Sequence, residues 1–172
     1  TMLRNMTRAK LHGECAPHKP VLILAIIDWI VEKLQDIDNI AQIYEAIPFR
    51  PELMNKFLNR WNKHVHTNVF QPTYITPIIH MQSEPFYRLV PYPDRSYNGV
   101  QSFAALESAY QGISLNAELI QLIIQYDSRL HLENTLLDII FSEQSTHLEV
   151  TDLVEISKAI HIGSLVKVLS GT

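Results

Sequence analysis

The chain has 172 residues, of which 47% are hydrophobic, and this size and composition are typical of one globular domain and exclude a fibrous or disordered protein. Its formal charge of −4 argues against a protein that binds nucleic acid over its whole surface, because such proteins are usually basic. The longest apolar run, residues 21–27, is far shorter than the ~20 residues of a membrane span, and a lone cysteine, Cys15, favours a reducing compartment, so we expect a cytoplasmic protein.

The N-terminal third is predicted to contain a short basic segment followed by a long helix. Residues 2–11 could form a short helix, and Gly13 and Pro17 then interrupt it. The long helix should begin near His18, because Pro20 suits the first helical turn, where its missing N–H is no loss. Its residues up to Leu34 are apolar almost all round, and this pattern predicts a central, buried helix.

The middle of the chain predicts a second helix and a hairpin. Residues 43–47 could form a short strand. Pro51 then opens a helix with one apolar face, which consists of Leu53, Met54, Phe57, Leu58 and Trp61. Residues 73–81 and 86–90 read as two strands around a turn, with Pro77 at an edge or a bulge. Residues 91–99 are a loop.

The last third is predicted to be mainly helical. Residues 102–110 and 130–141 carry apolar residues at helical spacing, and Ser114 could cap another helix between them. Residues 146–172 could form a helix and a strand. The predicted fold class is therefore α+β: a helix-rich single domain with a buried central helix and a small antiparallel β-hairpin or sheet.

No catalytic constellation is visible in the sequence. It contains no nucleophile-elbow motif and no glycine-rich phosphate loop, so we predict no catalytic residue and no cofactor. A small metal-dependent nuclease using His64, His66 and His80 is one alternative, but no Cys pair or dense carboxylate cluster accompanies these histidines. We therefore expect no metal site.

Basic residues gather around the start of the long helix. Within sixteen residues there is only one acid, Glu14, among Arg4, Arg8, Lys10, His12, His18 and Lys19. A helix start presents unpaired backbone N–H groups and the positive end of the helix dipole, which favour an anion such as phosphate. The alternative is an ordinary helix start with solvated charges.

Three segments, in order, resemble a known family. They are Ala-Pro-His-Lys-Pro-Val-Leu-Ile-Leu-Ala-Ile-Ile-Asp (16–28), Ile-Pro-Phe (47–49) before an amphipathic helix, and Thr-Pro-Ile-Ile-His-Met (76–81) followed by Phe-Tyr-Arg-Leu-Val (86–90). Together they resemble the sulfur-binding domain family of modification-dependent, HNH-type restriction endonucleases, which recognises phosphorothioated DNA. The resemblance implies a DNA-binding domain over residues 1–142, with residues 143–172 as an extension packed on it and leading toward a nuclease domain.

The resemblance also implies roles for particular residues. His18 and Lys19 would bind the DNA phosphate, while Thr76 and Pro77 would face the sulfur. His80 stands where a small residue is expected, so it either adds a phosphate contact or is structural. Sulfur is larger, more polarizable and less well hydrated than oxygen, so an apolar contact favours it while cations bind the remaining charge. Further basic residues could widen the DNA contact: Arg4, Arg8, Arg88 and Arg95.

The sequence thus predicts a non-catalytic module that binds double-stranded, modified DNA and has no membrane contact. The alternative is a protein-interaction or assembly module without nucleic-acid binding, which the acidic net charge and the apolar segment 148–170 favour. The oligomeric state stays open.

Overall fold

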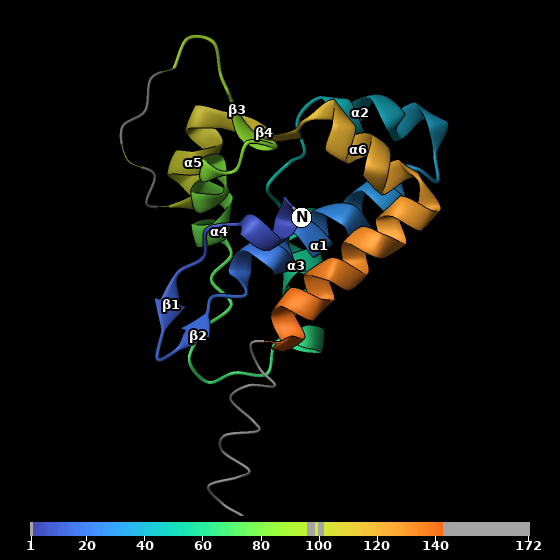
Figure 1. Cartoon of the computed structure of the whole chain (residues 1–172). Coiled ribbons are helices and arrows are strands. Elements are labelled where there is room, and N and C mark those ends of the chain that lie inside the picture. Colours follow the sequence, from blue (N-terminus) through green and yellow to red (C-terminus); the bar gives the residue numbers. More distant parts are fainter. Residues whose placement is uncertain (1, 96–98, 100–101, 143–172) are drawn as a thin grey trace, which may run out of the picture.

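The computed structural model describes residues 2–95, 99 and 102–142, and its fold is α+β and helix-rich, as predicted (Figure 1). One antiparallel pair of strands joins β1 (Lys10–Leu11) to β2 (Glu14–Cys15). Another joins β3 (Tyr87–Pro91) to β4 (Tyr110–Leu115). The remaining described elements are helices and short 3-10 turns.

The long helix α1 (His18–Lys33) lies at the centre of the molecule (Figure 1). It contacts α2 (Ile40–Tyr44), α3 (Glu52–His64), α4 (Ile75–His80) and α6 (Ala117–Ile124). Every residue of α1 from Lys19 to Ile27 is buried, and the prediction of a buried central helix is confirmed. Since burying one large aliphatic side chain stabilises a fold by about 1.5–3 kcal/mol, α1 is the main apolar support of the domain.

Helix α3 packs on α1 through its predicted apolar face, on which Leu53, Phe57 and Trp61 are buried. An ionic network reinforces this contact. The Arg60 guanidinium donates two hydrogen bonds of 2.6 Å to the Asp28 carboxylate of α1 and lies 3.4 Å from the carboxylate of Glu133. Glu133 belongs to a helix over residues 126–142, which includes the predicted helix 130–141. The network therefore joins three helices.

The predicted hairpin over residues 73–90 is wrong in its first half. Residues Ile75–His80 form helix α4, a 3-10 turn follows at Met81–Ser83, and β3 pairs with the distant β4. Pro77 lies at the third position of α4, where its missing N–H costs no hydrogen bond and its fixed φ suits a helix. The buried residues Tyr74, Ile78 and Met81 are spaced four and three apart, which is one face of a helix against α1.

Smaller predictions in the first half of the chain are also corrected. Only Leu3–Asn5 forms a 3-10 turn in the predicted helix 2–11, and Lys10–Leu11 is already strand. In place of a strand over 43–47, α2 covers Ile40–Tyr44, and Ile47 makes a single bridge to Ile113.

In the last third, α5 (Phe103–Ala109) confirms the predicted helix, and its cap is the Ser102 hydroxyl, which accepts from the backbone N–H of Ala105. The predicted cap Ser114 is instead a β4 residue, and Asn116 caps α6. The prediction for residues 146–172 lies outside the described residues.

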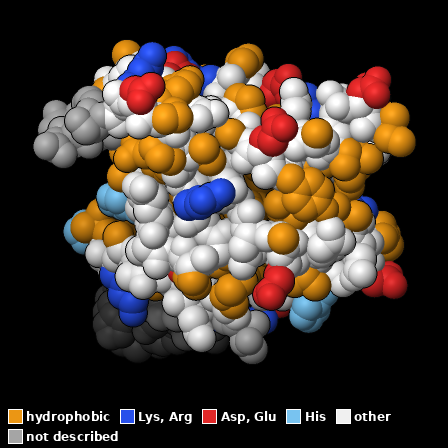
Figure 2. Space-filling view, turned by 90° about the horizontal axis from the view of Figure 1, so that it is seen from above, with side chains coloured by type: hydrophobic (Ala, Val, Ile, Leu, Met, Phe, Trp, Pro, Cys, Tyr) orange, Lys and Arg blue, Asp and Glu red, His pale blue; other side chains and the backbone are white. Residues whose placement is uncertain are grey.

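The face seen from above in Figure 2 carries hydrophobic, acidic and basic side chains interspersed with one another. It shows no continuous basic band. No helix in the described part of the chain combines the length and apolar character needed to cross a membrane.

Candidate anion-binding pocket

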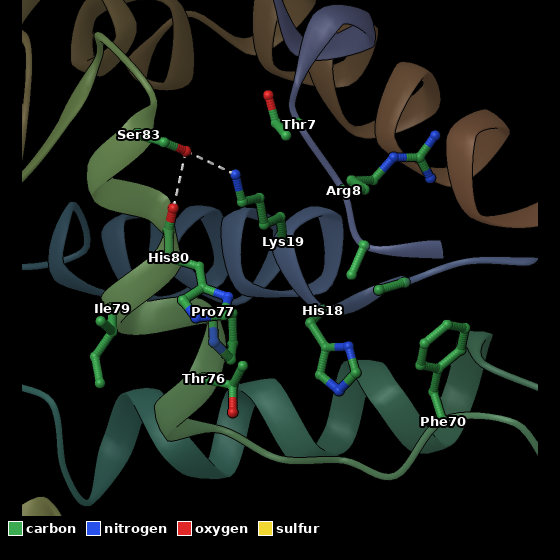
Figure 3. Close-up of a pocket in the computed structure, with 12 residues that line it drawn as sticks. Thr7, Arg8, His18, Lys19, Phe70, Thr76, Pro77, Ile79, His80 and Ser83 are labelled. Carbon is green, nitrogen blue, oxygen red and sulfur yellow. Dashed lines mark hydrogen bonds between the residues drawn. The ribbon is translucent and has the colours of Figure 1, made fainter. Parts of the chain in front are cut away.

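A cavity of about 540 Å³ opens between the start of α1, helix α4 and the segment that precedes β1 (Figure 3). Two stretches of the chain that are far apart in sequence, residues 7–19 and 70–83, supply its walls. The lining residues are Thr7, Arg8, Ala9, Ala16, His18, Lys19, Phe70, Thr76, Pro77, Ile79, His80 and Ser83.

Five residues of the segments 16–28 and 76–81 are predicted to contact the phosphate or the sulfur. All five line this pocket. They are His18 and Lys19 from α1, and Thr76, Pro77 and His80 from α4. The convergence does not depend on the predicted hairpin, because α4 directs the same residues toward α1.

The other predicted basic residues lie differently. Arg4 is paired with Asp138 at 3.7 Å, with both side chains largely exposed. Arg88 lines a separate cavity of about 370 Å³ beside β3 and β4. Arg95 donates to the Ser108 carbonyl at 2.5 Å and stacks on the Tyr92 ring. These three arginines therefore do not extend the pocket.

Arg8 lines the pocket with its backbone and the base of its side chain. Its guanidinium points away from Lys19 and His80 (Figure 3). Arg8 also lines a narrow neighbouring cavity together with Glu14 and Ile140. It is thus a wall residue in this structure.

Lys19 is buried and engaged by an acid. Its Nζ donates to Glu84 Oε1 at 2.5 Å and to Ser83 Oγ at 3.0 Å. The Lys19 and Glu84 side chains are only 9% and 8% exposed. A buried ammonium group needs such a partner, because an unpaired charge in a low-dielectric interior is costly. The Lys19–Glu84 pair therefore contributes no net charge to the pocket.

His18 is fixed at the first position of α1 by two aromatic contacts and one ring nitrogen. Its ring packs against Trp61 and Phe70, with centroid distances of 4.7 and 5.8 Å. Its Nε2 lies 2.7 Å from the Gln71 carbonyl oxygen and 3.1 Å from Thr73 Oγ1. Since a carbonyl only accepts, Nε2 carries a proton, and Nδ1 has no hydrogen-bond partner among the described residues.

The protonation of His18 depends on its surroundings. Burial, the largest effect, lowers its pKa, and the nearby His80 lowers it further. The Gln71 carbonyl opposes both effects and raises the pKa, because it accepts a hydrogen bond from the charged ring. The ring is therefore more often neutral than an exposed histidine would be.

The rest of the pocket is largely apolar. Pro77 is buried, and Ile79 and Phe70 are half-buried beside it. The His80 ring is exposed at the rim, and its backbone carbonyl accepts from Ser83 Oγ at 2.9 Å. An apolar wall beside imidazoles and hydroxyls suits an anion that is polarizable and weakly hydrated.

The three histidines of the metal hypothesis do not meet. His64 is buried with its Nε2 3.3 Å from an Arg60 nitrogen, His66 is exposed, and His80 lines the pocket. Within residues 2–95, 99 and 102–142, no group of three or more potential metal ligands gathers.

Sequence reasoning missed Glu84, Ser83 and Phe70. One signal was present for Glu84, because it is the only acidic residue between positions 65 and 93. Its partner Lys19 lies 65 residues away, and no local pattern indicates such a pair.

Comparison of the sequence with models of protein families finds none that matches, and a search of curated proteins finds no match either.

Proposed function

We propose that residues 1–142 form a DNA-binding module whose pocket takes a phosphorothioate group of double-stranded DNA, in the cytoplasm. The observation that carries this proposal is the convergence of His18, Lys19, Thr76, Pro77 and His80 on one pocket. Residues 143–172 would form an extension that leads toward a nuclease domain, and the chain itself would supply no catalytic group.

The chemistry of the pocket supports a sulfur-bearing phosphate. Pro77 and Ile79 offer the apolar contact that sulfur tolerates better than a hydrated oxygen does. His18, His80 and the Thr76 hydroxyl provide donors for the remaining oxygens of the same group. A sulfur atom on a DNA backbone can enter because the cavity is open, with the exposed His80 in its lining.

Replacing His18 with glutamine is expected to weaken binding of a phosphorothioate duplex about tenfold or more, because a hydrogen bond to a charged group is worth roughly 1.5–3 kcal/mol. Glutamine can still donate to the Gln71 carbonyl, so the fold should persist. Fluorescence anisotropy with matched duplexes, one carrying a single phosphorothioate of defined stereochemistry, measures the effect. His131→Gln, an exposed histidine on the helix over 126–142, is the control, and equal affinity of both variants would refute the proposed contact.

Binding should depend only modestly on salt. The chain is acidic, Arg4 and Arg95 have partners within the protein, and Arg88 lines a separate cavity, so few phosphates are neutralised. Each neutralised phosphate contributes about −0.9 to the slope of log affinity against log salt, and we expect a slope of roughly −1 to −3. Titrations at several salt concentrations test this, and a much steeper slope would indicate a broad basic contact surface.

A second candidate function, a protein-interaction module, is favoured by exposed apolar side chains on one group of helices. Ile37 and Tyr126 are 81% and 67% exposed, and Tyr44 and Leu122 lie partly exposed on the contacting helices α2 and α6. Light scattering separates the two functions. A stable dimer or partner complex without DNA affinity would favour this second candidate.

A further inference from the structure

The pocket carries cationic residues but little free positive charge. The Lys19 ammonium is neutralised by Glu84 at 2.5 Å, and the Arg8 guanidinium points away from the cavity (Figure 3). The remaining groups of the pocket that can become positive are the imidazoles of His18 and His80. An anion bound there must therefore be balanced by these two rings.

Because of its hydrogen bonds, His18 can balance the charge of a bound anion only after it takes up a proton. Nε2 already carries a proton for the Gln71 carbonyl at 2.7 Å. In the neutral ring Nδ1 then holds a lone pair, which repels an anion. Protonation at Nδ1 gives the ring both a positive charge and a second donor.

We infer that the pocket binds a phosphate-type anion together with a proton, so that the His18 ring is an imidazolium in the occupied state and faces the anion together with the His80 ring. This inference rests on the proposed function, because it concerns the same pocket and the same ligand chemistry. Lys19 and Glu84 act as positioning residues, whose pair joins the start of α1 to the segment after α4 without adding net charge.

The charged and titratable groups around His18 come from every neighbouring element. Lys19 lies on the same helix, His80 on α4, Glu84 after the turn Met81–Ser83, and Arg8 on the N-terminal segment. The side of the ring that faces α3 and the loop after it meets the uncharged residues Trp61, Phe70, Gln71 and Thr73.

The direction of the pH effect follows from these neighbours. Burial lowers the pKa of His18 in the free protein, so the empty pocket tends to hold a neutral ring. A bound anion favours the charged ring and raises its pKa, so binding takes up protons. Affinity should then rise as the pH falls toward and below the ordinary histidine value of about 6.5, and should level off at alkaline pH.

The test is the dissociation constant of the phosphorothioate duplex between pH 5.5 and 8.5 at constant salt. We expect affinity to fall at least tenfold across this range in the wild type. The His18→Gln/His80→Gln variant should lose most of that dependence, whereas His66→Gln/His131→Gln, with two exposed histidines replaced, should keep it. Wild-type binding that does not change with pH, or an unchanged dependence in His18→Gln/His80→Gln, would overturn the inference.

A second measurement separates this inference from the proposed function. The ring pKa of His18 is followed by NMR with and without inorganic thiophosphate. A higher pKa of His18 in its presence supports proton-linked anion binding even if no duplex binds, in which case only the DNA proposal fails. An unchanged pKa of His18 in saturating thiophosphate would overturn the inference.

Discussion

Replacing Glu84 with glutamine is expected to lower the free energy of unfolding by about 3 kcal/mol, because it leaves the buried Lys19 ammonium without a counter-charge. The side chains of both residues are less than a tenth exposed, so water cannot replace the lost partner. Urea denaturation measures the change, and Glu45→Gln, an exposed acid after α2, should alter stability by less than about 0.5 kcal/mol.

The double variant Lys19→Met/Glu84→Gln distinguishes an unpaired charge from a loss of packing. Methionine has nearly the length of lysine without its charge, so the double variant should recover most of the stability that Glu84→Gln loses. If Glu84→Gln were as stable as the wild type, the Lys19–Glu84 pair would not be a buried contact that stabilises the start of α1 against the segment after α4.

The substitution Gly112→Ala is expected to destabilise the domain by about 3 kcal/mol or more. A Cβ atom at this position would lie 2.3 Å from the Ile47 carbonyl oxygen and 2.8 Å from its carbonyl carbon. Those backbone atoms cannot move away freely, because Ile47 and Ile113 exchange two backbone hydrogen bonds of 2.8 and 2.9 Å. Strand β4 would have to separate from residue 47 to accept the methyl group.

Thermal unfolding followed by circular dichroism tests this expectation. Gln111→Ala, at the exposed neighbouring position of β4, is the control and should stay within about 0.5 kcal/mol of the wild type. A Gly112→Ala protein as stable as that control would show that residue 47 does not lie against β4.

The helices with a sustained pattern could be predicted from the sequence, whereas pairings between distant segments could not. Helix α1 is a long segment that is apolar almost all round with a proline in its first turn, and the apolar residues of α3 recur at helical spacing, so the secondary structure of both was clear. Four of the six residues 75–80 are β-branched, which favours a strand locally although Pro77 lies among them. These residues form a helix because α4, with Ile78 buried, packs on α1. The neighbouring sequence does not indicate that contact.

The pocket shows the same division. The resemblance brought together the residues from α1 and α4, and it did so although the local structure assigned to Pro77 was wrong. The Lys19–Glu84 pair was missed because an ion pair across 65 residues leaves no periodic trace in the sequence. The wall formed by Thr7 and Ala9 was missed for the same reason, since a polar segment gives no indication of what it packs against.

That N-terminal wall has a consequence for affinity. Thr7 and Ala9 are exposed, and the segment is anchored mainly by two buried side chains, Leu3 and Met6, at 4% and 5% exposure. The complete pocket requires this segment to be docked, so a substitution that weakens docking would raise the apparent dissociation constant to the intrinsic one divided by the docked fraction. Residues that never meet the ligand thus tune its affinity through preorganisation, and selection on Leu3 or Met6 could adjust binding strength without altering a single ligand contact.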